Sequence, residues 1–409
     1  MKIRSNILMS LLLIAMLVMT LFGAMNVKNR EKEKPEETPP VEDIPVSDVL
    51  PDSFKGQISD DFGVPEQVMK TIADYMDGYY LSLCKLETAD ISELFENEKM
   101  AKISERAISL LVNVRKMYDF DLSLKGGHYD LKVTGYRNEN GRHYVDILED
   151  DYMYFAFLNG IESSSYDIEN SFVIDENNKI VDLEKVQGYY LTFYDEKEKS
   201  VDEVYDYYIN QLKDLTDYNM EVLRSKAQSK PYESKLSYGV AYDRSKAVSY
   251  SNQYYHERNP KWYNFTDEGG NCQNYASQSM LEGGILMDNE GEAQWKCYIE
   301  DPEFDPEINE EETASGRSRS WVNVEYFYEY ARDNEGKGLV ADVNINSYYC
   351  EPGDIVIVGN ASLAHTVIVS KVVDGHVLVN SNSIDMKDYP LEAYVYTNIM
   401  AIKILGYNK

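Results

Sequence analysis

One cysteine lies at a position that suits a nucleophile. Cys272 follows the loop sequence Gly269-Gly270-Asn271 and opens a helical pattern that stops at Gly283-Gly284. A thiol in the first turn of a helix lies at the positive end of the helix dipole, which favours the thiolate and predicts a lowered pKa for Cys272. The thiolate is the form that attacks carbonyl carbon, so this position suits covalent catalysis. The local sequence leaves open the alternative of a buried structural cysteine, although the polar residues Gln273 and Asn274 follow directly.

A histidine and an asparagine lie on the two strands of a predicted hairpin. Residues 365–373 form a strand that begins with His365, and Asp374-Gly375 is a two-residue turn signal before the return strand at 376–382. If this turn is the loop, Val373 faces His376, and counting back along both strands places Val367 opposite Asn382. Asn382 is then the diagonal neighbour of His365 on the same face, within reach of its side chain. A β-bulge would shift the register by one residue and bring Ser381 or Asp385 to this place instead.

These three residues predict a cysteine hydrolase site. Cys272 is the expected nucleophile, His365 the base that takes its proton, and Asn382 the group that orients the imidazole. Backbone N–H groups at the start of the helix would stabilise the oxyanion, and water would hydrolyse the resulting thioester. His365 taken alone would more often be a polar residue at a strand end than a catalytic base. The four cysteines show no paired-ligand spacing, so we expect no metal and no other cofactor.

The segment 240–400 resembles the putative amidase domain family, a branch of the papain-like cysteine hydrolases found in exported bacterial proteins. The similar stretches are YDRSKAVSYSNQYY, GGNCQNYASQSMLEGGI, SRSWVNV, PGDIVIV, AHTVIVSKV and SNSIDMKDYPL, in the order of the family, and they cover some 40% of the chain. The resemblance implies the same roles for Cys272, His365 and Asn382. The sequence departs from the family at Asn271, where aspartate is usual, and at Asn382, where histidine is common. Trp321 could line the cleft, but we expect it to be a core residue.

The elements that must position the site predict an α+β protein with two domains. Residues 53–225 begin with helical patterns, continue with antiparallel hairpins and a strand at 188–194, and end with a helix, which suggests an α+β domain of cystatin or NTF2-like shape. Residues 226–236 are polar and read as a linker. Residues 237–409 are the expected catalytic domain, with the Cys272 helix packed on an antiparallel sheet in a papain-like arrangement.

The N-terminal end predicts export. Lys2 and Arg4 precede an uncharged run in residues 1–25, which we interpret as a signal peptide or a single membrane anchor. Residues 26–52 are charged and proline-rich, as in an extended stalk or linker. Both alternatives place the remaining chain outside the cytoplasm, extracellular or anchored to the membrane. In that compartment Cys297 and Cys350 could form a disulfide, whereas Cys84 is expected to be a small buried residue.

Charge excludes several classes of function. The chain has 409 residues and a formal net charge of -31, which argues against binding to nucleic acid or adhesion to an anionic surface. The acidic segment Glu300–Glu312 lacks the spacing of a calcium loop and reads as a solvated surface loop. We therefore expect an exported cysteine amidase or peptidase that cleaves peptide-type amides, such as those of a peptidoglycan-like substrate in the cell envelope. The alternative is a surface-displayed binding or scaffolding protein whose papain-like domain is catalytically silent.

Overall fold

The computed structural model describes residues 51, 53–185, 193, 200–226, 232–290, 294–301, 304, 316–360 and 364–409. The predicted export segment 1–25 lies outside these residues, as do nearly all of the stalk, nearly all of the strand predicted at 188–194 and most of the acidic segment Glu300–Glu312. None of the described helices combines the length and the apolar sequence that crossing a bilayer requires.

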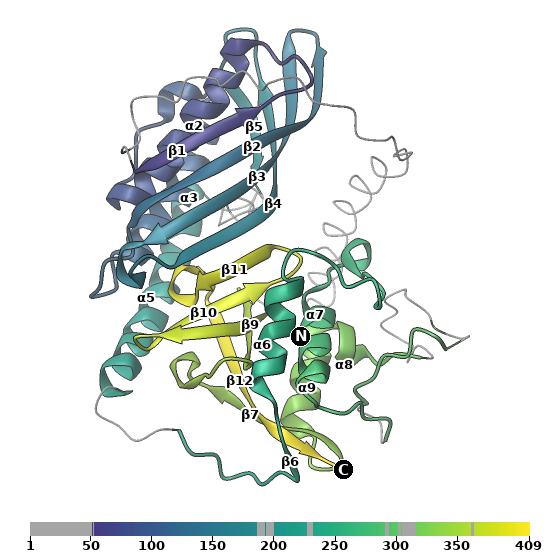
Figure 1. Ribbon diagram of the computed structural model, residues 1–409. Coiled ribbons are helices and arrows are strands. Elements are labelled where there is room, and N and C mark those ends of the chain that lie inside the picture. The colour runs from purple at the N-terminus through teal and green to yellow at the C-terminus, as the bar shows by residue number, and fades with distance from the viewer. Residues whose placement is uncertain are drawn as a thin grey trace, which may run out of the picture.

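The N-terminal half, residues 53–226, packs helices against a mostly antiparallel sheet (Figure 1). The helical patterns and antiparallel hairpins predicted for this half are confirmed, and one face of the first helix, which includes Val68 and Ile72, is buried. An unpredicted first strand joins the sheet parallel to the second strand. The elements are β1 (Phe54–Ser59), α2 (Glu66–Lys85), η1 (Ser92–Leu94), α3 (Glu98–Arg115), β2 (Leu124–Glu139), β3 (Arg142–Phe155), η2 (Ala156–Leu158), β4 (Glu162–Ile174), β5 (Ile180–Lys185) and α5 (Val201–Lys226).

The C-terminal half, residues 232–409, surrounds a second part of the sheet with short helices. Local sequence explains several element starts: the side chains of Asp243 and Asn323 cap the helices that follow them. The elements are β6 (Val240–Ala241), α6 (Arg244–Tyr254), η3 (Thr266–Glu268), α7 (Cys272–Glu282), α8 (Arg319–Val322), α9 (Val324–Asp333), β7 (Gly338–Ile345), η4 (Ser347–Tyr349), β8 (Ile355–Gly359), β9 (His365–Val373), β10 (His376–Ser381), β11 (Asp385–Pro390), η5 (Leu391–Ala393) and β12 (Asn398–Asn408).

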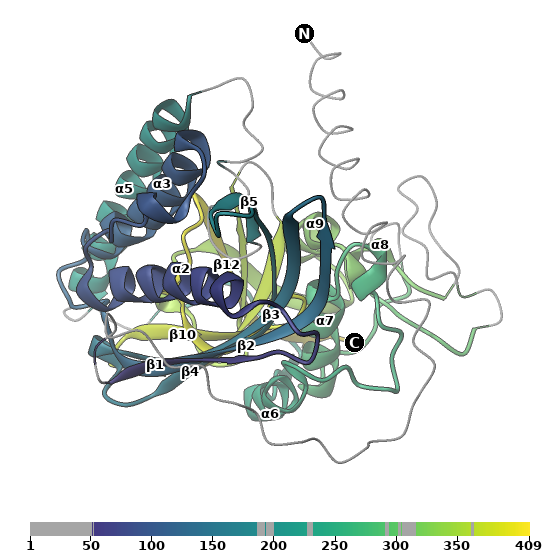
Figure 2. The same ribbon diagram turned by 90° about the horizontal axis from the view of Figure 1, so that it is seen from above.

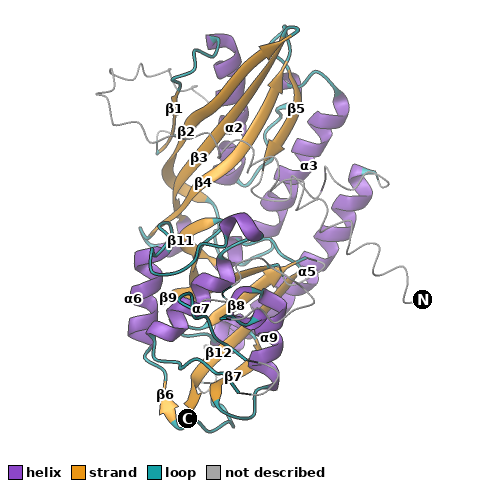
Figure 3. Ribbon diagram, turned by 90° about the vertical axis from the view of Figure 1, so that its right-hand side faces the viewer, coloured by secondary structure: helices purple, strands orange, loops and turns teal. Residues whose placement is uncertain are grey.

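One sheet runs through both halves. Its strand order is β1-β2-β3-β4-β11-β10-β9-β8-β12-β6, with β5 paired to β4 and β7 paired to β12. The two halves meet where β4 pairs antiparallel with β11, with Tyr166 opposite Asp385 and Ser164 opposite Lys387 (Figure 3). The chain is therefore α+β, with a mixed sheet that does not stop at the predicted linker.

The sheet separates two hydrophobic cores. Figure 2 shows α2, α3 and α5 on one side of the sheet and α6 on the other. The first core combines residues of the N-terminal half with the valines of one face of the C-terminal strands, such as Val356, Val367 and Val369. The second core lies on the opposite face, where Ile357 and Ile368 pack with α6, α7 and α9. Because both faces are covered, β8 is apolar throughout.

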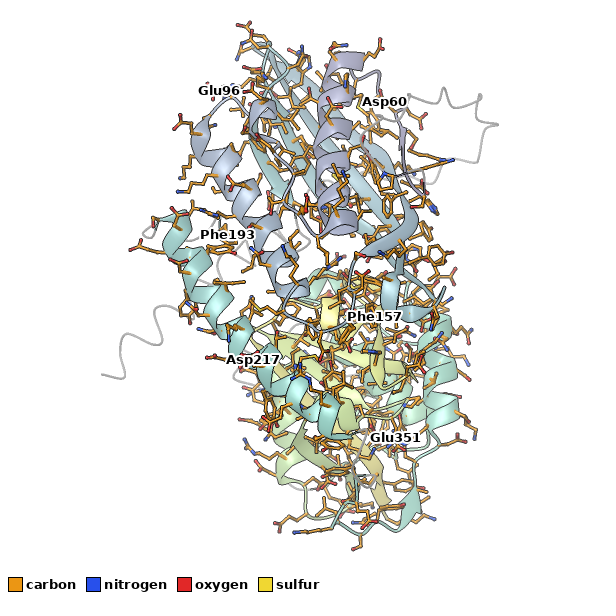
Figure 4. The ribbon with its side chains drawn as sticks, turned by 90° about the vertical axis from the view of Figure 1, so that its left-hand side faces the viewer. Asp60, Glu96, Phe157, Phe193, Asp217 and Glu351 are labelled. Carbon is orange, nitrogen blue, oxygen red and sulfur yellow. The ribbon has the colours of Figure 1, made fainter. Side chains whose placement is uncertain are left out.

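Side chains also join the two halves. Phe157 follows β3 and lies between the halves (Figure 4), with its ring 4.6 Å from the ring of His376 on β10. On α5, the Oδ1 of Asn219 accepts a hydrogen bond from Asn346 Nδ2 at 2.9 Å. The first core is consequently continuous across the boundary that the sequence predicted between residues 225 and 237.

The positions of the two cores answer whether Cys297 and Cys350 can form a disulfide, which the sequence left open. The structure contains no disulfide among its four cysteines, all of which lie in described residues. Cys297 belongs to the core beneath α7, whereas Cys350 belongs to the core on the other face of the sheet. The sheet itself therefore keeps these two thiols apart.

A buried ion pair in the N-terminal half carries a prediction about stability. Glu149 is fully buried and accepts hydrogen bonds from Lys185 Nζ at 2.5 Å and from the Tyr80 hydroxyl at 2.6 Å. Replacing Lys185 by methionine leaves a buried carboxylate without its cation, so we expect the free energy of unfolding to fall by about 3–5 kcal/mol in urea titrations. Lys213→Met removes an exposed ion pair with Asp217 and is the control, for which no change is expected. A Lys185→Met protein as stable as the control would contradict the prediction.

Candidate active site

A loop that contains two glycines precedes Cys272, the first residue of α7. Gly269 and Gly270 have φ values of +103° and +124°, which residues with side chains rarely adopt. Gly270 faces Ser383, which lies between β10 and β11: a Cβ built on Gly270 would stand 3.6 Å from Ser383 Oγ, at van der Waals distance. Two hydrogen bonds fix the side chain of Asn271, the residue before Cys272. Its Oδ1 accepts from the backbone N–H of Phe265 at 3.1 Å and from Asn274 Nδ2 at 2.8 Å.

The Cys272 thiol lies against the first residues of β9. The backbone N–H groups of Thr366, Gln273 and Cys272 itself lie within hydrogen-bond reach of Sγ. Thr366 directly follows His365 in the chain, so the thiol lies beside the start of the strand that carries the imidazole. A second contact fixes α7 on β9, because Thr366 Oγ1 donates to Gln273 Oε1 at 2.8 Å.

Burial reverses the pKa shift that the sequence predicted for this thiol. Cys272 is only 8% exposed, and burial raises the pKa of its thiol, while the three N–H groups oppose the rise. The helix start therefore has the predicted donors, but the loss of water outweighs them. The predicted lowering of the pKa is wrong for the resting protein, in which Cys272 is a neutral thiol.

A β-bulge changes the register that places the third group. His376 faces Val373, as predicted, and the pairing follows the count as far as Leu378 opposite Lys371. Val379 then faces Val369, so Ser370 has no opposite residue. Its hydroxyl points to the Leu378 carbonyl at 3.1 Å and to Asp388 Oδ1 at 2.8 Å, which stabilises the bulge.

The shifted register places Ser381 beside the imidazole. Ser381 Oγ lies 2.6 Å from His365 Nε2 and also 2.6 Å from the Ile384 carbonyl oxygen. A carbonyl can only accept, so the serine hydrogen goes to Ile384, and Nε2 must carry the hydrogen of the other bond. This network assigns the Nε2–H tautomer and leaves Nδ1 as the basic nitrogen of His365.

The imidazole is buried as a neutral base. His365 is 8% exposed, and burial lowers its pKa from 6.5 to about 4. At neutral pH both members of the site are therefore uncharged.

Asn382 lies one residue beyond the position that the sequence predicted. Its Oδ1 accepts from Asn271 Nδ2 at 2.8 Å, and its Nδ2 donates to the Tyr254 carbonyl at 2.9 Å. Both ends of its amide are thus used to hold the loop before Cys272 against α6, and the hydrogen bond to the imidazole comes from Ser381. Ser381 is, with Asp385, one of the two residues that the sequence predicts at this place in a bulged hairpin. The signal for the bulge is the polar pair Ser370-Lys371 between the valines of the strand.

The remaining polar residues after Cys272 are structural. Asn274 and Ser277 are buried, and Asn274 Oδ1 accepts from the Trp321 indole at 2.8 Å. Trp321 is fully buried, which confirms that it is a core residue. Among the described residues, no cluster of histidine, cysteine, aspartate or glutamate side chains could hold a metal ion.

The burial of His365 predicts a difference in acid stability. The unfolded chain binds a proton below about pH 6.5, whereas the folded chain binds it only near pH 4. Stability is therefore complete above about pH 6.5 and falls as the pH drops towards 4, by about 3 kcal/mol from this group. His365→Gln should lose less stability than wild type between pH 7 and 4 in urea titrations. The control is His143→Gln on the half-exposed sheet surface, which should follow wild type, and identical pH slopes for all three proteins would refute the prediction.

Comparison with known proteins finds similarity in the part of the chain that contains these residues. Residues 241–405 match the family model described as "Putative amidase domain". A relative from Bacillus subtilis (strain 168), named Uncharacterized protein YhbB, is 29% identical over 168 residues, which are 39% of this chain and 48% of that protein. The chain thus spans about half the length of this relative. No solved structure matches the chain. The family match points to a hydrolase of amide bonds for this part of the chain.

Proposed function

We propose that the protein is a cysteine amidase or peptidase, with Cys272 as the nucleophile and His365 as its general base. The observation that carries this proposal is the contact of the Cys272 thiol with the residue next to His365, an imidazole whose Nε2 is held by Ser381. A thiol, a base and an orienting group in this sequence make up the constellation that acyl transfer requires.

The neutral resting state defines the reaction steps. The Sγ proton passes to Nδ1 of His365 as the new bond forms between Sγ and the carbonyl carbon of the amide. The electron pair of the carbonyl moves to oxygen, where the N–H groups of Cys272, Gln273 and Thr366 can stabilise the negative charge. Collapse of this intermediate breaks the C–N bond, and the leaving amine takes the proton from Nδ1. Water then attacks the thioester, and its proton returns by way of Nδ1 to Sγ.

Ser381 replaces Asn382 in this scheme. A serine hydroxyl accepts the Nε2 hydrogen but carries no charge, so it orients the ring without raising its pKa as a carboxylate would. Asn382 acts through Asn271 and keeps the nucleophile loop in place.

The rest of the sequence supports a substrate outside the cytoplasm. The charged start and apolar run of residues 1–25 support export, and a peptide-type amide outside the cytoplasm supports a role in the cell envelope. We propose stem peptides of a peptidoglycan-like polymer as the substrate class.

The proposed function is tested with purified cell-wall fragments. The protein should release new amino groups from these fragments at neutral pH, measured by an amine-reactive dye and by mass spectrometry of the products. Protein treated beforehand with iodoacetamide, with alkylation of Cys272 verified by peptide mapping, is the control and should be inactive. Equal amine release by treated and untreated protein would exclude Cys272 as the nucleophile.

A further inference from the structure

One loop touches both sides of the proposed site. The 381–385 loop, which runs from the last residue of β10 to the first residue of β11, forms a hydrogen bond with His365 through Ser381. Its next two residues hold Asn271, because Asn382 Oδ1 accepts from the Asn271 amide at 2.8 Å and Ser383 Oγ accepts from Asn271 N at 2.6 Å. A small displacement of this loop would therefore move the base and the nucleophile together, and displacements of about 1 Å can cost a reaction 100-fold in rate.

The middle of the 381–385 loop is strained. Ser383 has a φ of +110°, a value that residues with side chains rarely adopt. Such a conformation costs on the order of 1–3 kcal/mol and persists only where the surroundings hold it. The holding contact is a hydrogen bond from Ser383 N to Asp385 Oδ1 at 2.9 Å.

Asp385 anchors the loop to the segment after α6. Its side chain is buried, and Oδ2 accepts from Arg258 Nη1 at 2.8 Å. The same oxygen lies 3.3 Å from His256 Nδ1, and Arg258 also donates to the His256 carbonyl at 2.9 Å. The Asp385 carboxylate thus connects the strained backbone at Ser383 to the side chains of Arg258 and His256.

The N-terminal half continues this chain of contacts. Asp385 begins β11 and stands opposite Tyr166 of β4, the strand at which the two halves join (Figure 3). The Tyr166 ring lies 4.7 Å from the His256 ring, and Asp167 Oδ2 lies 4.0 Å from His256 Nδ1. The position of Asp385 is therefore set partly by a strand that lies outside the matched segment 241–405.

We propose that Asp385 and Arg258 are positioning residues for the Cys272–His365 pair, held in place by β4 of the N-terminal half. This role rests on the proposed function and deepens it, because it makes the N-terminal half part of the apparatus that aligns the site. Asp385 touches neither reacting atom and acts through Ser383 and Ser381.

Iodoacetamide is a suitable probe, because it needs no knowledge of the substrate. In the full chain, alkylation of each cysteine is followed by mass spectrometry from pH 5 to 8. Because His365 would take the thiol proton as the new S–C bond forms, the neutral wild-type Cys272 should react faster at pH 6 than an ordinary thiol and show little dependence on pH over this range. Asp385→Asn should lower the rate at pH 6 by about tenfold or more and restore the steep pH dependence of an ordinary thiol. Asp385→Glu, which keeps the carboxylate, should recover part of the rate.

A second buried ion pair supplies the matched control. Asp354 is fully buried, accepts from Arg244 Nη1 at 2.7 Å and from backbone N–H groups, and lies at the start of β8 away from the 381–385 loop. Asp354→Asn should cost stability and leave the reactivity of Cys272 unchanged. Buried Cys297 and Cys350 report unfolding, since they react only when the cores open.

Each outcome decides a different point. If wild-type Cys272 is no faster than an ordinary thiol at pH 6, the proposed function itself fails. If wild type is fast and Asp385→Asn is equally fast, only the positioning role of Asp385 is overturned. If Asp385→Asn unfolds and exposes Cys297 and Cys350, Arg258→Gln takes its place, because it removes the same ion pair from a side chain at the surface. A folded Arg258→Gln protein with the wild-type rate and pH profile would likewise overturn the positioning role.

Discussion

Cys272→Ala and His365→Ala are each expected to lower amine release from cell-wall fragments at least ~1,000-fold at neutral pH. In the proposed mechanism the two side chains act as one unit. Burial raises the pKa of the thiol, so Cys272 would become a nucleophile only when His365 takes its proton. Loss of either member of such a unit typically removes nearly all of its contribution to the rate. Initial rates of amine release at saturating fragment concentration provide the measurement.

The pH dependence distinguishes this neutral pair from a preformed thiolate. The active form requires neutral His365, so activity should fall as the pH drops towards about 4 and stay level from about pH 5.5 to neutrality. A preformed thiolate–imidazolium pair would instead require the protonated imidazole. His365→Ala should lose the level region, since its residual rate depends on thiolate formed by ionisation alone.

Cys297→Ala is the control for the cysteine substitution. Cys297 is buried in the same core as Cys272 and has a pKa raised to about 12 by burial, so it is an inert thiol at neutral pH. Its replacement should leave the rate of amine release unchanged. A Cys272→Ala protein that keeps more than a tenth of the wild-type rate would show that another group is the nucleophile.

Residues 232–409 produced without the N-terminal half are expected not to fold into a soluble, cooperative domain. Removing residues 53–226 uncovers one face of β8, β9 and β10. Six buried valines of these three strands lie on that face, among them Val358, Val377 and Val379. Burial of a valine is worth about 1.5–3 kcal/mol, so losing half of this burial costs about 5 kcal/mol or more. That is comparable with the whole stability of a typical domain, about 5–15 kcal/mol. The deletion also turns β11 into an unpaired edge strand, which favours aggregation.

The measurement compares soluble yield, near-ultraviolet circular dichroism and urea unfolding of the shortened and the full chain. The matched control is the full chain with a protease site inserted between Lys226 and Tyr232. After cleavage the two pieces should elute together on gel filtration, because the shared sheet and core hold them. A cooperative, monomeric fragment 232–409 would instead show two independent domains, as the sequence analysis expected.

Much of the local structure could be predicted from the sequence, because it depends on short-range patterns. The Asp374-Gly375 turn and the start of α7 at Cys272 follow from turn chemistry and helix signals that involve only neighbouring residues. The choice of Cys272 and His365 rests on the same signals, since each stands at the start of a predictable element.

The tertiary structure decided the chemistry of the site. The third group depends on one bulged residue, Ser370, whose hydroxyl is stabilised by Asp388 from a different strand, and this single insertion exchanges Asn382 for Ser381 beside the imidazole. The charge state depends on burial from every side, which outweighs the helix dipole at Cys272 and neutralises His365. The pairing of β4 with β11 joins residues more than two hundred positions apart, and no local pattern records it. The sequence by itself therefore determined most of the local elements and the candidate residues Cys272 and His365, whereas long-range packing decided how these residues are charged, oriented and held.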